Sequence, residues 1–268
     1  VDAGWSRADV DNTIYFWEGV GGVGGSGNYH YYNSSGGGGA VGIGDATQFI
    51  PAMQSVFVYT ATTSTSIGVN NKARTHNDQA YWKQSKSDVD VPIMRVNVAN
   101  QDNLVDEAII RFLPDASVNY DGEYDAFKLT GSNYPQLYSL TEDATKLAIN
   151  SLPEYDNDLE IPLGFTAPTT GSYTIGLNQF ENFEDIDKLY LHDLFTDELH
   201  SVSMDPNYSF VGSPADDPNR FVLKFGLQGN TSETESQLSY VYAYDDIVVV
   251  SLQGGIHQAD ITIYNLMG

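Results

Sequence analysis

Apolar and polar residues alternate in short runs along most of the chain. The run Ser172–Leu177 places Tyr173, Ile175 and Leu177 on one face and small or polar residues on the other, as expected for a half-buried strand. Many similar β-branched and aromatic runs are separated by Gly, Asn, Asp and Pro, whereas helical spacing is scarce. The pattern predicts an all-β fold of antiparallel β-sandwich domains, jelly-roll or immunoglobulin-like, with little helix.

Residues 1–90 are predicted to form a glycine- and aromatic-rich N-terminal β region. Strands are expected at Thr13–Trp17 and Tyr29–Tyr32, with the glycine-rich segment Gly19–Gly27 between them. A second glycine run follows, which indicates long hairpin loops. Gln54–Thr60 and Ser64–Val69 are then expected to form a strand pair.

Residues 91–230 have the densest strand pattern and are predicted to form an antiparallel β-sandwich. A polar segment, Gly229–Gln237, resembles a linker and ends this region. The expected strands are Ile93–Val98, Glu107–Phe112, Ala126–Leu129, Gln136–Leu140, Leu147–Ile149, Ile161–Phe165, Ser172–Leu177, Lys188–Asp193, Tyr208–Val211 and Phe221–Phe225.

Residues 238–268 are predicted to begin a further, incomplete β module. Its strands are Leu238–Tyr244, Ile247–Leu252 and Asp260–Leu266, with a tight turn at Asp245 and Asp246. Three strands are few for an independent module, so they must pack on the preceding domain, continue beyond the sequence, or pair with another chain. The residues proposed for such self-assembly are Tyr242, Ile247, Val249, Ile261, Ile263 and Leu266.

The charge balance narrows the choice of partners. The chain carries 12 basic and 36 acidic residues, a net charge of −24, which repels nucleic acid and anionic lipid. No run approaches the ~20 apolar residues of a membrane-spanning helix, so we expect no membrane insertion. The absence of cysteine excludes disulfides and thiolate metal sites. The sequence opens Val-Asp-Ala-Gly without Met, as expected after removal of a leader or in a fragment.

One group of acidic residues is a candidate metal site. Asp115, Asp121, Glu123 and Asp125 lie in "PDASVNYDGEYDA", where alternating carboxylates and a turn carbonyl suit Ca²⁺. The alternative is a turn capped by Asp side chains with exposed charges. Asp156, Asn157 and Asp158 form a weaker candidate. No other cofactor is expected.

Enzyme signatures are weak throughout the chain. Gly22–Gly27 matches G-x-G-x-x-G, but no helix follows, so a flexible loop is the better interpretation. His192 and His200, with the nearby carboxylates Asp193, Asp197 and Glu198, could form a zinc site only if a turn brought the two rings together. No H-E-x-x-H is present, so surface histidines are the better interpretation. No G-x-S-x-G is present, and no pair of carboxylates is distinguished as a glycosidase site. We therefore expect no catalytic residues.

Aromatic residues near the glycine-rich segments raise the alternative of sugar binding. Trp5, Trp17, Tyr29, Tyr31 and Tyr32 could stack on sugar faces if they are exposed. Aromatic residues in strands are more often core residues or cross-strand pairs.

Several segments carry a resemblance to a known family. "VYAYDDIVVVSLQGGIHQADITIYNLMG" (Val241–Gly268) resembles the first half of the C-terminal sorting domain of type IX secretion substrates in Bacteroidota. "DEAIIRFLPDASVNYDGEYDAFKLTG" (Asp106–Gly131) and "IPLGFTAPTTGSYTIGL" (Ile161–Leu177) are similar to regions upstream of such signals. The resemblance implies export to the cell surface or the medium. The later strands of the sorting domain are absent from this sequence.

Three functional hypotheses follow. The first is a secreted, non-catalytic surface protein of structural or adhesive type, which self-assembles into a filament by strand complementation. The second is a module that binds a glycan or a surface protein through its loops. The third is the accessory, non-catalytic part of a larger secreted enzyme.

Overall fold

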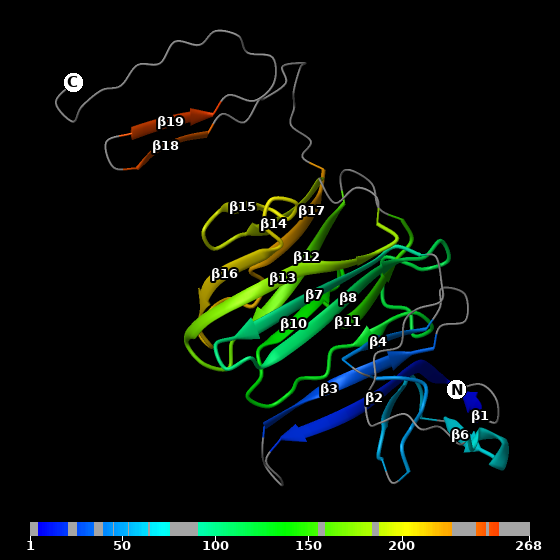
Figure 1. The fold of residues 1–268 in the computed structure, drawn as a ribbon. Coiled ribbons are helices and arrows are strands. Elements are labelled where there is room, and N and C mark those ends of the chain that lie inside the picture. The colour runs from blue at the N-terminus through cyan, green and yellow to red at the C-terminus, as the bar shows by residue number, and fades with distance from the viewer. Residues whose placement is uncertain are drawn as a thin grey trace. The chain divides into compact units, whose positions relative to one another are not determined.

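The protein is all-β and β-sandwich-like in its computed structural model, as the sequence predicts (Figure 1). The structure describes residues 5–20, 26–34, 40–44, 46–52, 54–63, 65–75, 91–154, 159–183, 188–226, 240–244 and 247–251. The chain divides into two compact units, Val1–Leu227 and Gln228–Gly268. Among the described residues, the one helical element is a short 3₁₀ turn at Asn71–Ala73, and no helix has the length and apolarity to cross a membrane.

The large sheet of the first unit is 11-stranded and curls until it is nearly a barrel. Its order is β15-β14-β17-β12-β10-β11-β8-β7-β13-β16, with β9 pairing β11. Neighbouring strands are antiparallel except β8 and β11, which are parallel. The strands are β7 (Ile93–Asn100), β8 (Val105–Phe112), β9 (Ala126–Phe127), β10 (Gln136–Leu140), β11 (Lys146–Leu152), β12 (Glu160–Thr166), β13 (Gly171–Glu181), β14 (Leu189–Asp193), β15 (Glu198–Ser201), β16 (Asn207–Gly212) and β17 (Phe221–Phe225).

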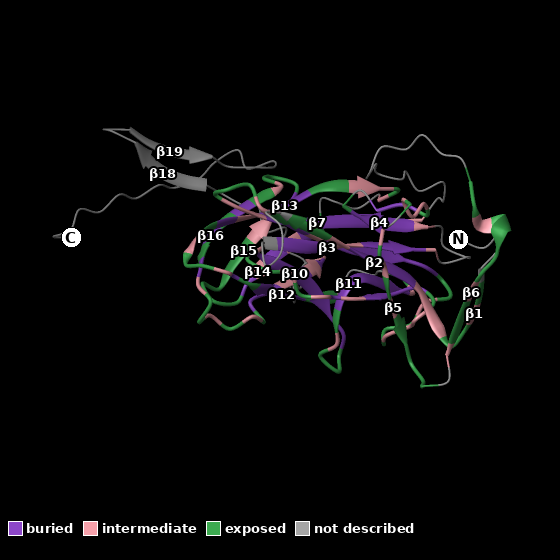
Figure 2. Cartoon of the chain, turned by 90° about the horizontal axis from the view of Figure 1, so that it is seen from below, coloured by how far each residue is buried: buried purple, intermediate pink, exposed green. Residues whose placement is uncertain are grey.

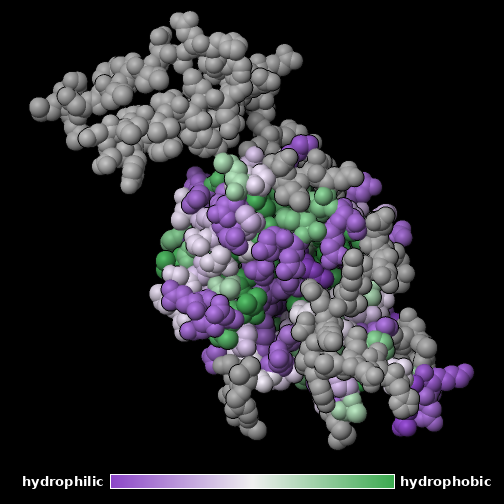
Figure 3. Space-filling view, viewed as in Figure 1, coloured by the Kyte–Doolittle hydropathy of each residue, from purple (hydrophilic) through white to green (hydrophobic). Residues whose placement is uncertain are grey.

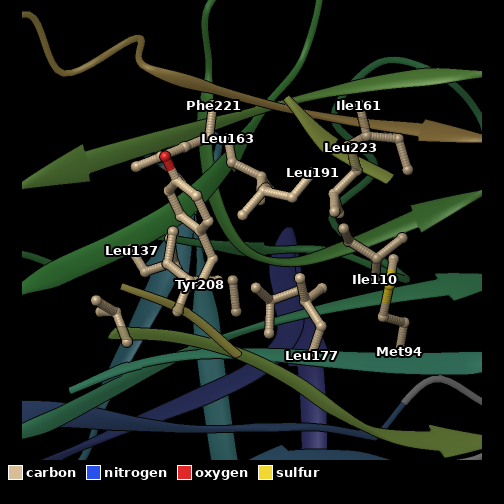
Figure 4. Packing of buried hydrophobic residues seen from close by; sticks show 14 of the residues in the cluster. Met94, Ile110, Leu137, Ile161, Leu163, Leu177, Leu191, Tyr208, Phe221 and Leu223 are labelled. Carbon is tan, nitrogen blue, oxygen red and sulfur yellow. The ribbon is translucent and has the colours of Figure 1, made fainter. Parts of the chain in front are cut away.

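The inside of the large sheet holds the main hydrophobic core. The predicted alternation in β13 is confirmed, because Tyr173, Ile175 and Leu177 are all buried there. Side chains from opposite parts of the curled sheet meet around Leu191 and Leu223 (Figure 4). Burial of such side chains is worth about 1.5–3 kcal/mol each, so this core is the main source of stability.

The small sheet has the order β4-β3-β2-β5. Its strands are β2 (Val10–Val20), β3 (Ser26–Asn33), β4 (Val41–Ile43) and β5 (Phe57–Thr60). The β2–β3 hairpin pairs from Thr13 opposite Asn33 to Val20 opposite Ser26. Gly27 is required in this hairpin, because a Cβ there would lie 2.4 Å from the Trp17 ring.

The predicted pairing of residues 54–60 with 64–69 is wrong. β5 pairs with β2, while β6 (Ser66–Val69) pairs with β1 (Trp5–Ala8) in a separate two-stranded sheet. The reason is packing: Val58 on β5 packs against the apolar cluster that contains Ile14 and Phe16 of β2. The burial gained when β5 pairs with β2 outweighs the closeness of β5 and β6 in the sequence.

The small sheet packs on the outer face of the large sheet. Tyr15 and Tyr31 of the small sheet share a buried cluster with Ile93, Ile109 and Ile149 of the large one. Figure 2 shows this buried centre, with the exposed β1, β5 and β6 at its margin. Residues on both sides of position 90 therefore share one core within Val1–Leu227.

The second unit contains β18 (Tyr240–Tyr244) and β19 (Ile247–Ser251), an antiparallel pair in which Tyr242 lies opposite Val249. The predicted turn at Asp245 and Asp246 lies outside the described residues. So does the third predicted strand, which carries the assembly candidates Ile261, Ile263 and Leu266.

Candidate functional site

The loop between β8 and β9, residues 113–125, joins the small sheet to the large sheet of the first unit through hydrogen bonds. The Asn12 backbone N–H donates to the Gly122 carbonyl at 2.9 Å, and the Thr13 hydroxyl donates to the Asp125 carbonyl at 2.9 Å. A Cβ on Gly122 would lie 2.4 Å from the Asp11 carboxylate, so glycine lets this loop approach β2 closely. The loop thereby fixes the edge of the small sheet over the large one.

The predicted calcium residues lie in this loop, where two of their carboxylates bind backbone amides. Asp125 accepts from the amides of Asp121 at 2.8 Å and Ser151 at 2.7 Å. Asp121 accepts from the Glu123 amide at 2.9 Å, while Asp115 and Glu123 are exposed. In the described part of the chain, no three His, Asp or Glu side chains are placed to hold a metal ion. Calcium binding by this group stays a prediction.

Asp125 is buried beside a buried cation. Burial raises the pKa of Asp125 to about 7, against the opposing effects of its amide donors and the Arg111 charge. Burial also lowers the pKa of Arg111 to about 10. Arg111 donates to the Ser151 hydroxyl at 2.8 Å and to the Tyr124 carbonyl at 2.6 Å. Arg111, Asp125 and their partners thus form a buried hydrogen-bond network between the small and large sheets.

Six aromatic side chains gather where the small sheet extends past this loop, and we name them the aromatic strip. Phe57 and Tyr59 lie two residues apart on the edge strand β5, so both project from the same face. They are 51% and 43% exposed, and the other four are half-buried. The strip consists of Trp17, Tyr29, Phe57, Tyr59, Tyr120 and Phe127.

The rings of the strip contact one another in two groups. The Tyr29 ring lies 4.9 Å from Trp17 and 5.9 Å from Phe57, centroid to centroid. Tyr59 lies 4.4 Å from Phe127. Phe127 in turn stacks on Tyr120 at 4.0 Å. Such contacts hold the rings in place before any ligand arrives, which lowers the entropy cost of binding.

Polar groups border the strip at Tyr120. The Tyr120 hydroxyl donates a hydrogen bond to the Asp11 carboxylate. Burial and the nearby Asp121 charge raise the pKa of Asp11, although the Tyr120 hydrogen bond opposes this effect. Burial likewise raises the pKa of Tyr120 above its usual value. Apolar rings beside hydrogen-bonding oxygens suit a ligand with an apolar face and hydroxyl edges.

The aromatic residues predicted from the sequence as possible sugar-binding residues lie in different parts of the structure. Trp17 and Tyr29 belong to the strip, whereas Tyr31 and Tyr32 are core residues, 0% and 5% exposed. The side chain of Trp5 lies outside the described part of the structure. Sequence reasoning missed four strip residues. The available signal was the spacing of Phe57 and Tyr59 by two, which places both rings on one face of a short strand whose other face carries Val58.

The other sequence candidates do not form a site in the described residues. His192 contacts Asp197 at 3.0 Å and His200 contacts the Asp205 carbonyl at 2.8 Å, so the two rings bind different partners. The weaker acidic group at 156–158 lies outside the described ranges, as does most of the first glycine-rich segment.

Comparison with known proteins gives one match. A family model described as a domain of unknown function (DUF8693) matches residues 5–225, which include the large and small sheets and the aromatic strip. No curated protein and no solved structure matches the chain.

Proposed function

Because the chain belongs to the DUF8693 family, whose description assigns no activity, we propose a function from its geometry. The protein is a secreted, non-catalytic surface protein of adhesive type, and its aromatic strip binds neutral glycans. The single observation that carries this proposal is the row of half-exposed, mutually packed rings beside a loop fixed by hydrogen bonds.

The chemistry of the strip favours a sugar ligand. The C–H face of a pyranose is apolar and can cover the exposed rings of Phe57 and Tyr59, while its hydroxyls can reach the Asp11 carboxylate beside Tyr120. Grouped exposed apolar side chains are also typical of ligand-binding surfaces. The net charge of −24 disfavours uronic, sialylated or sulfated glycans, since like charges repel.

Export to the cell surface is part of the same proposal. It is supported by the resemblance of Val241–Gly268 to the start of a type IX sorting domain. The measurement is fractionation of the native host: the protein is expected in the outer surface fraction or the medium. Confinement to the cytoplasm would contradict this part of the proposal and leave the glycan site untouched.

Glycan binding is tested with an array of neutral oligosaccharides (β-glucan, xylan, mannan and chitin fragments) beside anionic ones. We expect binding to at least one neutral class and none to the anionic glycans. Phe57→Ala should raise Kd tenfold or more, which corresponds to about 1.4 kcal/mol. Phe195→Ala removes an exposed ring far from the strip and is the matched control. An empty array, or equal losses in the two variants, would refute the proposal.

A second candidate function is self-assembly through the C-terminal unit. In the described residues, β18 and β19 form a sheet of only two strands, and a two-stranded sheet is marginally stable in water without further partners. A strand from another chain could extend it. We expect concentration-dependent oligomers in light scattering and electron microscopy. Val249→Pro removes a backbone donor of β19 and should reduce them. Monomers at all concentrations would exclude assembly.

A further inference from the structure

A second exposed apolar surface lies at the end of the large sheet, on β14–β16 and their turns, away from the aromatic strip. Its side chains are Leu194, Phe195, Leu199, Met204 and Val211, which are 42–75% exposed, with Phe195 the most exposed. We name them the β14–β16 patch. On the corresponding part of Figure 3, hydrophobic surface alternates with hydrophilic side chains. Large exposed apolar side chains grouped in this way are typical of interaction sites.

Phe195 is exposed and yet held in place. The Arg220 guanidinium lies 5.1 Å from the centre of its ring and 4.7 Å from that of Phe210 on another side. Arg220 itself is buried, and its charge is compensated there by a bidentate pair with Asp193 at 2.9 and 2.7 Å. The Phe195 amide also donates to Asp193 at 3.0 Å. A ring fixed in this manner loses little entropy on binding, as binding hot spots require.

Arg220 also connects Phe195 to Val211 on β16, the terminal strand at the other end of the sheet order. It donates to the Val211 carbonyl at 2.7 Å, and its own carbonyl accepts from the Leu194 amide at 2.8 Å. The Arg220 side chain therefore contacts two of the five patch residues, and its backbone carbonyl binds a third. Arg220 thus holds Leu194, Phe195 and Val211 together at this end of the large sheet.

The margin of the patch is acidic. From Leu189 to Asn219 the sequence contains no lysine or arginine. The Asp197 side chain is 94% exposed, and Glu198, Asp205 and Asp217 are also exposed. An apolar centre surrounded by charges of one sign favours a partner that carries charges of the opposite sign.

We propose that the β14–β16 patch binds a basic segment of another protein, with a large apolar side chain of that segment against Phe195 and Lys or Arg residues at its margin. The surplus of acidic over basic residues in this chain, 36 against 12, disfavours a second copy as the partner. The same charge disfavours an anionic membrane. This inference is independent of glycan binding, because it uses different residues.

The test uses the full chain and three labelled synthetic peptides of nine residues: alternating Lys and Phe, alternating Lys and Ser, and alternating Glu and Phe. We expect fluorescence anisotropy to show binding of the Lys/Phe peptide that weakens at high salt. The Lys/Ser and Glu/Phe peptides should bind at least tenfold more weakly.

Phe195→Ser should weaken binding of the Lys/Phe peptide tenfold or more, whereas Val118→Ser, at an exposed position outside the patch, should leave it unchanged. The double variant Asp197→Asn, Glu198→Gln should weaken it at low salt only. Equal binding of the Phe195→Ser and Val118→Ser proteins, or of all three peptides, would overturn the proposal, as would the absence of binding. Tyr59→Ala, within the aromatic strip, should not affect the peptide.

Discussion

At the scale of single residues, buried charged groups hold the small sheet in place on the large sheet. Arg111 is fully buried and binds oxygens from the small sheet, the connecting loop and β11. Asp125 lies in the same cluster and binds two backbone amides. Burial of such groups costs free energy unless they are satisfied, so each contact here specifies one arrangement of loop and sheets.

The titration of Asp125 gives the first stability prediction. Its folded pKa of about 7 lies above the value of about 3.9 expected in the unfolded chain. Between these values the unfolded state releases the proton while the folded state retains it. Stability therefore falls by about 1.4 kcal/mol for each pH unit as pH rises. Asp125→Asn removes this dependence, so the stability difference between wild type and variant should shrink from pH 4.5 to pH 7.5 in urea unfolding. A constant difference would contradict the assignment.

At the scale of elements, Asp106 joins four strands or their ends. Its carboxylate on β8 accepts from Lys128 after β9 at 2.5 and 2.6 Å and from Asn28 on β3 at 2.8 Å. It also accepts from the Leu137 amide on β10 at 2.6 Å. One buried carboxylate thus links the small sheet to three strands of the large one.

Removal of the Lys128 charge should destabilise the first unit strongly. Lys128→Met leaves the Asp106 carboxylate buried without its cation, and breaking a buried pair in this way costs about 3–5 kcal/mol. Lys224→Met is the matched control, because Lys224 pairs with exposed Glu160 at 2.8 Å and surface pairs contribute about 0–1 kcal/mol. Urea unfolding measures both. Similar losses in the two variants would show that the Asp106 cluster does not hold the sheets together.

At the scale of the whole first unit, closure of the large sheet protects its edges. β15 and β16 are its terminal strands, and a buried network connects this end of the curled sheet. Tyr208 on β16 donates to Asp193 on β14 at 3.0 Å, and Arg220 caps the Val211 carbonyl. The burial of Asp193 would raise its pKa, but the hydrogen bonds from Arg220, Phe195 and Tyr208 outweigh burial and lower it. Edges satisfied in this way are poor templates for another strand.

The sequence pattern predicts the elements well and their long-range arrangement poorly. The strands Gln136–Leu140 and Phe221–Phe225 are confirmed residue for residue. Most of their side chains are buried, so the apolar pattern in the sequence marks these strands directly. β15 was missed, since "ELHS" at an edge carries no apolar alternation.

The parallel pairing of β8 with β11 and the contact of Tyr59 with Phe127 join distant segments, and no local pattern encodes them. The same limit applies to the site. Tyr31 looks like Tyr29 in sequence but is covered by the large sheet.

Whether the aromatic strip binds a neutral glycan is decided by isothermal titration of one array-selected oligosaccharide into three proteins. Wild type and Tyr59→Phe should bind with similar Kd, because both present the same ring face. Tyr59→Ala should lose tenfold or more while its urea midpoint stays unchanged, since Tyr59 is 43% exposed at an edge strand. Equal binding by Tyr59→Ala and wild type would show that the aromatic strip is not the glycan site.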